Sequence, residues 1–155
     1  MPNLAITTLD DELRENPHCL EELYQLRIAV DADIPDAQTN PSLRFEDFMR
    51  EIESEITIKD AFFIAKEANQ YIGLTCLNRN TVTPDSLNQT TTGVIRHWRN
   101  KGIAFTLKRY GIAYAKAKGY TSITTYMDSR NTPMCTLNEK LGFRPGVAAV
   151  LMERR

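Results

Sequence analysis

The chain has 155 residues, of which 42% are hydrophobic and 25% charged, and its formal net charge at pH 7 is −1. This length and composition are typical of one folded globular domain, which we expect to span residues 1–155. A net charge near zero argues against a general nucleic-acid or membrane surface. No non-polar run approaches the roughly 18 to 20 residues that a membrane span needs.

The cysteines, the histidines and the N-terminus favour a cytoplasmic protein without a metal centre. Cys19, Cys76 and Cys135 are far apart and odd in number, which is typical of reduced thiols buried like small hydrophobic residues. Met1-Pro2-Asn3-Leu4 lacks the basic start and the non-polar stretch of a signal peptide. The two histidines do not have the spacing of zinc ligands, so we expect no metal.

The first half of the chain predicts a strand, two helices and a hairpin. Asn16-Pro17 has the form of a helix N-cap followed by proline at the first helical position, and non-polar residues recur from Cys19 to Val30 at helical spacing. Glu67–Gln70 supplies the turn of an antiparallel hairpin. The expected elements are a strand at Leu4–Thr8, a helix from Asn16 to Val30, a helix marked by Phe45, Phe48, Met49 and Ile52, and strands at Ala61–Ala65 and Tyr71–Leu77.

The second half predicts alternating strands and helices. Gly119 and Gly142 stand where helix C-termini favour a left-handed residue. A long helix joins two strands as a crossover, so these strands should be parallel. We therefore expect an α/β fold of the mixed α+β kind, with a mixed sheet flanked by about four helices. The expected elements are strands at Gln89–Ile95, Thr121–Met127 and within Val147–Glu153, and helices at Gly102–Lys118 and Thr132–Leu141.

The segment from Thr92 to Ala104 carries the strongest functional signal. A strand ends, a short loop with Arg99 and Lys101 follows, and Gly102 opens a helix. The first turn of a helix has N–H groups without intrahelical partners, and glycine lets a phosphate approach the backbone closely. Neither the Walker pattern nor a three-glycine dinucleotide fingerprint is present. The physics predicts a phosphate or pyrophosphate site, and the alternative is an ordinary helix start with a solvated basic rim.

Two motifs in this region carry a family resemblance. Arg99-Asn100-Lys101-Gly102-Ile103-Ala104 resembles the acetyl-CoA signature of the GNAT N-acetyltransferase superfamily, Arg/Gln-x-x-Gly-x-Gly/Ala. Asn131-Thr132-Pro133-Met134, followed by Leu137-Asn138-Glu139-Lys140-Leu141-Gly142-Phe143, is similar to the superfamily's second CoA-contacting segment. The close resemblance covers about Thr92–Phe143, and the first half of the chain agrees only in its order of elements.

The resemblance implies acetyl-CoA as co-substrate. Its pyrophosphate would lie on the N–H groups of Arg99–Ala104, and its pantetheine arm would pair like a strand with Thr92–Ile95. A backbone N–H near Val94 would then donate to the thioester carbonyl, whose oxygen gains charge as an amine attacks. The side chains of Val94 and Ile95 are equally explained by core packing. Met134, at helical spacing, favours core packing, which is compatible with a contact to CoA. The implied CoA-binding residues are Thr92, Gly93, Val94, Ile95, Arg99, Asn100, Lys101, Gly102, Ile103, Ala104, Asn131, Met134 and Asn138.

The sequence departs from the superfamily at the positions that move protons. Asn138 stands where many members have a tyrosine as general acid, and an amide can donate a hydrogen bond but cannot transfer a proton. Tyr126 is the alternative acid. Asp128 is the candidate base, and Asp31 and Asp33 are candidates for binding the acceptor, although each also fits an ordinary exposed carboxylate. The acceptor site is expected between the loops Asp31–Pro41 and Asn78–Ser86.

The expected function is transfer of acetyl from acetyl-CoA to a primary amine of a small molecule or peptide. The missing tyrosine and strand acid leave open a non-catalytic CoA-binding sensor or interaction module, and a different acyl-CoA donor is a third possibility. The short segment after Phe143 leaves a sheet edge that a second copy of the chain could complete, so we expect a homodimer.

Overall fold

A mixed sheet organises the residues that this computed structural model describes, namely 3–32, 43–125, 131–144 and 149–150. Within them the sheet has six strands in the order β1-β2-β3-β4-β5-β6. Of these described strands, only β4 and β5 pair in parallel, and α4 makes the crossover between them. The elements are β1 (Leu4–Thr8), α1 (Leu9–Glu15), α2 (Cys19–Asp31), α3 (Phe45–Glu53), β2 (Thr57–Glu67), β3 (Gln70–Arg79), β4 (Ser86–Val94), a 3₁₀ turn (Arg96–Trp98), α4 (Ile103–Ala117), β5 (Ser122–Thr125), α5 (Thr132–Lys140) and β6 (Ala149–Val150).

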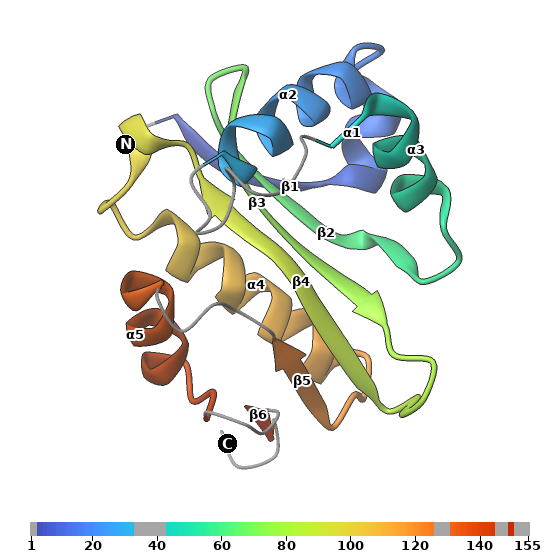
Figure 1. The fold of residues 1–155 in the computed structure, drawn as a ribbon, viewed down its shortest axis with the longest axis vertical. Helices are drawn as coiled ribbons and strands as arrows, with labels where there is room; N and C mark the ends of the chain where they lie inside the picture. Colours follow the sequence, from blue (N-terminus) through green and yellow to red (C-terminus); the bar gives the residue numbers. More distant parts are fainter. Residues whose placement is uncertain (1–2, 33–42, 126–130, 145–148, 151–155) are drawn as a thin grey trace.

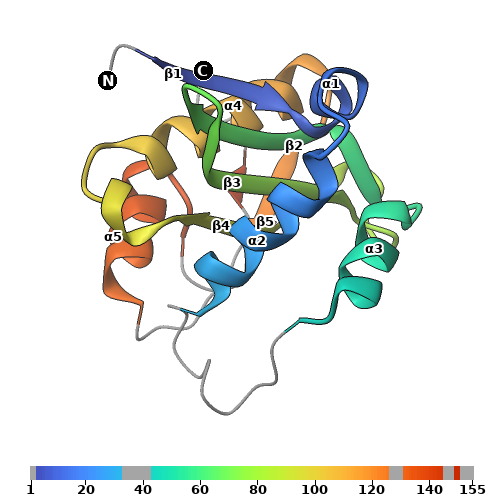
Figure 2. The ribbon, with the colours of Figure 1, turned by 90° about the horizontal axis from the view of Figure 1, so that it is seen from above.

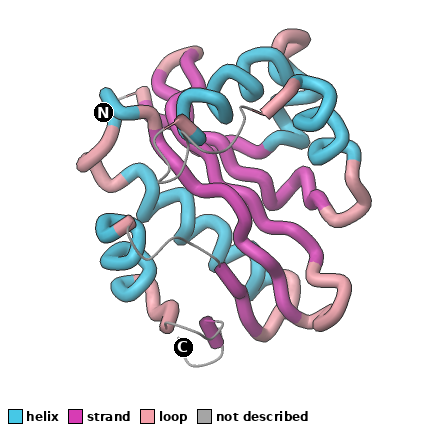
Figure 3. Tube along the Cα trace, viewed as in Figure 1, coloured by secondary structure: helices cyan, strands magenta, loops and turns pink. Residues whose placement is uncertain are grey.

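Helices cover both faces of the sheet, with α1 to α3 on one side of the diagonal strands and α4 and α5 on the other (Figure 1, Figure 3). On the first face, Leu23 of α2 and Phe48 of α3 are buried against Leu74 of β3. On the second face, Leu107 of α4 belongs to a cluster that includes Phe143. Figure 2 looks toward the face of the sheet that α2 covers, with α2 in front of the strands and α3 at the right. The sheet is therefore the middle layer, and β4 has a helix packed on each face.

The prediction of two helices before the second strand was incomplete, because the structure has three. Helix α1 follows β1 directly, and Thr8 caps it by accepting a hydrogen bond from the N–H of Asp11 at 3.1 Å. Asn16, expected as the N-cap of the next helix, is instead the C-cap of α1. The N-cap of α2 is His18, and the side chain of Asn16 accepts a hydrogen bond from its N–H at 2.9 Å. The described part of the chain thus has five α-helices.

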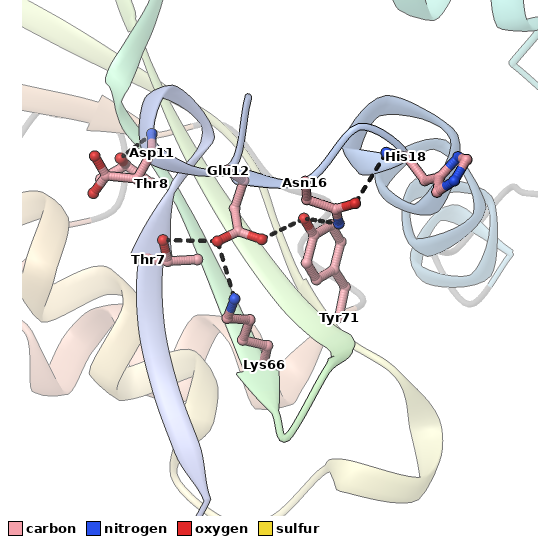
Figure 4. A network of polar contacts seen from close by, with 8 residues as sticks. All are labelled: Thr7, Thr8, Asp11, Glu12, Asn16, His18, Lys66 and Tyr71. Carbon is pink, nitrogen blue, oxygen red and sulfur yellow. Dashed lines mark hydrogen bonds and ion pairs between the residues drawn. The ribbon is translucent and has the colours of Figure 1, made fainter. Parts of the chain in front are cut away.

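A buried carboxylate attaches α1 to the sheet (Figure 4). Glu12 is 2% exposed and accepts hydrogen bonds from Tyr71 Oη at 2.6 Å, Lys66 Nζ at 3.0 Å and Thr7 Oγ1 at 3.2 Å. Burial by itself raises the pKa of Glu12, but the hydrogen bonds from Tyr71 and Lys66 and the charge of Lys66 outweigh it and lower the pKa below its usual value. The network joins four elements, so it fixes α1 although the helix has only seven residues.

The strand pairings predicted from local signals are confirmed. Strands β2 and β3 form the antiparallel hairpin, with Glu67 opposite Gln70, and β4 is parallel to β5. Gly119 and Gly142 have φ of 84° and 94°, as their helix-ending positions require. Both hairpin strands extend beyond their predicted bounds. The predicted continuation of β5 through Tyr126 and Met127 lies outside the described residues.

Candidate functional site

Strand β4 is paired with the parallel strand β5 over only the first half of its length. It pairs with β5 only from Ser86 to Gln89, whereas its pairing with β3 continues to Val94. Thr75 pairs with Thr92 and Leu77 with Gln89, so β4 holds one residue more than β3 over this stretch. Such a bulge bends a strand and increases its twist. Within the described residues, the second half of β4 therefore has a paired strand on its β3 side only.

The open edge of β4 presents backbone groups of alternate residues. Ile95 N–H donates to Ile72 O at 2.9 Å, so Ile95 faces β3. Because the groups of a strand alternate between its two edges, the N–H groups of Thr92 and Val94 point to the other edge. The carbonyl of Val94 accepts a hydrogen bond from Arg99 Nε at 2.9 Å. The side chain of Val94 is buried against α4, so its core role and a main-chain role are compatible.

The loop after β4 forms an open, positively charged helix start. Asn100 and Gly102 both have left-handed backbones, with φ of 63° and 80°. Among the described residues no side chain caps the N-terminus of helix α4, and its first turn closes with Thr106 N–H donating to Gly102 O at 3.1 Å. A Cβ at Gly102 would have no atom within 4 Å, so the space beside it is empty. Together with exposed Lys101, this geometry fits a phosphate group on the N–H groups of the first turn.

The second motif lies on α5, which packs beside α4 (Figure 1). Asn131 is the N-cap of α5, and its Oδ1 accepts a hydrogen bond from Met134 N–H at 3.3 Å. Asn138 is buried, and its Oδ1 accepts a hydrogen bond of 2.6 Å from Lys108 Nζ on α4. The predicted positions on α4 and α5 are thus joined through a lysine that the sequence reasoning did not single out.

Lys108 is 1% exposed, and its burial lowers the pKa of the ammonium to about 8. A signal for it was present in the sequence, because Lys108 stands four residues after Ala104 and four before Ile112 on the non-polar side of a helix. A lysine at that spacing is also compatible with a long side chain that reaches solvent at its tip, so the pattern alone does not identify burial.

The predicted acidic residues are only partly described. Asp31 is the last residue of α2, and its Oδ2 accepts a hydrogen bond of 3.0 Å from Arg27 Nε. Burial raises the pKa of Asp31, although the neighbouring Arg27 acts in the opposite direction. Asp33, Asp128 and the alternative acid Tyr126 lie outside the described residues. The structure therefore brings the two predicted motifs together through Lys108 and Asn138, and the roles predicted for Asp33, Asp128 and Tyr126 stay predictions.

A cavity of about 280 Å³ lies between α3 and strands β2 to β4. It reaches Thr90 and Thr91, the residues of β4 where the register shifts, and it includes Asn78 from the segment expected to bind the acceptor. Arg27 and Glu51 form an ion pair of 2.8 Å in its wall. The lining residues are Arg27, Phe48, Glu51, Ile52, Ser54, Ile56, Thr57, Phe62, Cys76, Asn78, Thr90 and Thr91.

Comparison with known proteins assigns the arrangement to a family. A model of the Acetyltransferase (GNAT) family matches residues 10–143. The chain belongs to the GNAT family. A comparison of this GNAT protein with curated proteins finds no match.

Solved structures have the same fold as this GNAT protein. An N-acetyltransferase from Staphylococcus aureus Mu50 is 19% identical, with a TM-score of 0.75 over 94% of this chain and 86% of the other. The Escherichia coli ribosomal-protein-S18-alanine N-acetyltransferase is 14% identical, with a TM-score of 0.71 over 93% of this chain and 79% of the other. PaiA N-acetyltransferase from Thermoplasma acidophilum, solved in complex with coenzyme A, is 17% identical, with a TM-score of 0.65 over 94% of each chain. At these identities, the likeness establishes the fold.

The described residues contain no group of three or more His, Cys, Asp or Glu side chains arranged to hold a metal ion. None of the described helices combines the length and the non-polar composition that a membrane span requires.

Proposed function

We propose that this GNAT protein transfers the acetyl group of acetyl-CoA to a primary amine by direct attack in a ternary complex. The observation that carries the proposal is the uncapped start of α4, which lies immediately after the open edge of β4. A helix start of this kind suits a pyrophosphate, and an unpaired strand edge suits an extended amide-containing chain such as pantetheine. The strand edge and the helix start are adjacent, as the pantetheine and the pyrophosphate are in one CoA molecule.

The loop residues have distinct roles in this proposal. The N–H groups of Gly102, Ile103 and Ala104 bind the pyrophosphate, with Lys101 adding charge and Asn100 shaping the turn. Arg99 braces the site, because its Nε holds the carbonyl of Val94. This contact ties the strand end to the phosphate loop.

Strand β4 provides the surface for the acyl arm. Thr92 and Val94 direct their N–H groups to the open edge, while Gly93 and Ile95 support them by pairing with β3. The N–H of Val94 polarises the thioester carbonyl during attack. On α5, Asn131, Met134 and Asn138 border the arm. Acetyl-CoA supplies the activated acyl group, and the chain supplies position and hydrogen bonds.

The acceptor is a primary amine of a small molecule or a peptide, and we propose that it approaches through the cavity beside α3. The cavity leads to Thr90 and Thr91, which precede the proposed acyl-binding residues on the same strand. Arg27 in its wall is paired with both Glu51 and Asp31, so this group of three side chains has a net negative charge that attracts a cationic amine. Asp31 and Asp33 as acceptor ligands, and Asp128 as base, stay predictions.

Assembly is a separate part of the proposal. A homodimer would cover an exposed sheet edge, and β1 and β6 are the two outer strands of the described sheet, with β6 on the C-terminal side from which the dimer was predicted. Sedimentation equilibrium distinguishes a monomer from a dimer, because a single species of 17.7 kDa would contradict the dimer.

Acetyl-CoA binding tests the site directly. At 100 times its Kd, a ligand stabilises the folded state by about 2.7 kcal/mol, which a thermal melt detects. Gly102→Glu should abolish this stabilisation, since a carboxylate would occupy the phosphate position. Gly119→Glu is the matched control, because Gly119 also has a left-handed backbone and open space at its Cβ position but lies at the other end of α4. Equal stabilisation of both variants by acetyl-CoA would contradict the proposed loop.

Measurement of turnover distinguishes an acetyltransferase from a non-catalytic CoA-binding module. A panel of primary amines is incubated with the protein and acetyl-CoA, CoA release is followed, and the acetylated product is confirmed by mass. Binding of acetyl-CoA without release by any amine favours the sensor. Faster release from another acyl-CoA identifies a different donor.

A further inference from the structure

The ammonium of Lys108 is a buried cation that the function proposed above does not use. We propose that Lys108, oriented by Asn138, donates the proton that the departing CoA sulfur receives during acetyl transfer. The inference rests on the proposed function, since it needs CoA bound between β4 and α5. It assigns the acid step to a lysine of α4 instead of to a residue of α5.

Among the residues that the structure describes, no acidic side chain pairs with Lys108. Its ammonium donates to Asn138 Oδ1 at 2.6 Å, and its Nζ lies 5.4 Å from the centroid of the Phe143 ring. Within the described residues, no ion pair involves Lys108, and burial is the cause of its lowered pKa. An ammonium has three N–H bonds to donate, and this contact uses one of them. Lys108 therefore retains donor capacity in an almost fully buried position.

A purely structural role explains this arrangement poorly. A buried charge without an opposite charge destabilises the fold, whereas a non-polar side chain of similar size would pack between α4 and α5 without that cost. The amide oxygen of Asn138 orients the ammonium but cannot take its proton. A transient anion at this position would give the cation a counter-charge, and the departing thiolate is an anion of that kind.

Lys108 also lies close to the proposed CoA site. It is five residues after Ile103, which corresponds to about 7.5 Å along α4 from the proposed phosphate loop. Its partner Asn138 belongs to the motif on α5. Phe143, whose ring the ammonium approaches, is in the same non-polar cluster as Val94. The lysine thus stands among the residues of α4, α5 and β4 that are proposed to surround the acyl arm.

The proton balance of the step is complete. The amine nitrogen attacks the thioester carbon, a C–N bond forms and the C–S bond breaks. Lys108 gives one proton to the sulfur, which leaves as the thiol, and the proton that the nitrogen loses returns through solvent to restore the ammonium. The pKa of Lys108, at about 8, is close to the 8.5 of a thiol, so the transfer is nearly balanced in energy.

The thiol pKa of bound CoA tests the inference without any acceptor. Thiolate absorbance is titrated with CoA bound to the wild type, to Lys108→Met and to Asn138→Asp. A cation beside the sulfur favours the thiolate, so the wild-type complex should titrate about one pH unit or more below the Lys108→Met complex. Asn138→Asp keeps a hydrogen-bond acceptor for Lys108 but neutralises its charge. It should therefore behave like Lys108→Met, a change that a structural contact would not produce.

The outcomes are distinguishable. If the wild type binds CoA and all three complexes titrate at the same pH, Lys108 does not act on the sulfur and the inference is overturned. If the wild type does not bind CoA, the proposed function fails, and the inference fails with it. If Lys108→Met does not fold, Asn138→Asp decides the result alone.

Discussion

Gly93 is the position where packing constrains the proposed CoA strand most tightly. A Cβ built at Gly93 would overlap Cγ1 of Val30 on α2 and would lie 3.2 Å from Val30 Cβ and 3.3 Å from its Cγ2. Rotation of Val30 about χ1 removes the methyl overlap only if the hydrogen on its Cβ takes the place of Cγ1, and a helix strongly favours a single χ1 rotamer for valine. Val30 Cβ stays 3.2 Å away in every rotamer. In Gly93→Ala, the end of α2 must therefore move away from β4.

The expected cost of this overpacking is about 1 to 3 kcal/mol. For a chain of this size, each kcal/mol lowers Tm by roughly 2 to 4 °C, so Gly93→Ala should melt about 2 to 12 °C below the wild type. Gly111→Ala is the control, because its Cβ would meet Leu77 Cδ1 at 3.3 Å, which is the end of a flexible side chain. The helix propensity of alanine at that position offsets the closer contact, so Gly111→Ala should change stability little.

Urea unfolding of Gly93→Ala, Val30→Ala and the double variant measures the coupling. Shortening Val30 removes the methyl groups that Gly93→Ala would strike, so the double variant should be more stable than the sum of the single changes by about 1 kcal/mol or more. A wild-type Tm for Gly93→Ala, or additive effects in the cycle, would refute the packing argument.

Three further predictions concern the buried carboxylate of Glu12, the buried thiol of Cys76 and the cavity beside α3. The pKa of Glu12 is lowered in the folded protein, so its contribution to stability is present above about pH 4.5 and is lost as the pH falls through the folded-state pKa. Glu12→Gln should therefore make the free energy of unfolding depend less on pH in the acid range, as urea unfolding at several pH values measures. It should also lower that free energy by about 1 to 3 kcal/mol at pH 7. Burial raises the pKa of the Cys76 thiol to about 12, so iodoacetamide at pH 8 should label half-buried Cys135 first in the native protein, as read by peptide mass. Thr90→Phe fills the rim of the cavity and should raise the KM of the amine without changing acetyl-CoA affinity, and a raised Kd for acetyl-CoA would argue against separate sites.

The sequence predicted correctly those features that depend on residues close together in the chain. The hairpin turn at Glu67–Gln70 and the periodicity of α4 are local, and both predictions were confirmed. Helix α1 was missed because seven residues are too few for a periodic pattern to stand out. Its capping residue Thr8, followed by acidic residues in the first turn, was the available signal.

The same distinction applies to the candidate site. The phosphate loop is encoded in consecutive residues, so its left-handed Gly102 could be anticipated from the sequence. The burial of Lys108 depends on Asn138, which is 30 residues away on another helix, and no local pattern contains that information. The bulge in β4 likewise arises from a mismatch with β3.

The packing of β4 leaves very little of the strand for chemistry. Gly93 meets α2 on one face, Val94 is buried against α4 on the other, and β3 occupies one edge. The remaining edge offers only backbone groups, and Arg99 already holds the carbonyl of Val94. Recognition on this strand must therefore depend on its backbone conformation more than on its side chains. Proton transfer must come from neighbouring elements, and among the described residues Lys108 is the buried titratable group that α4 places toward α5.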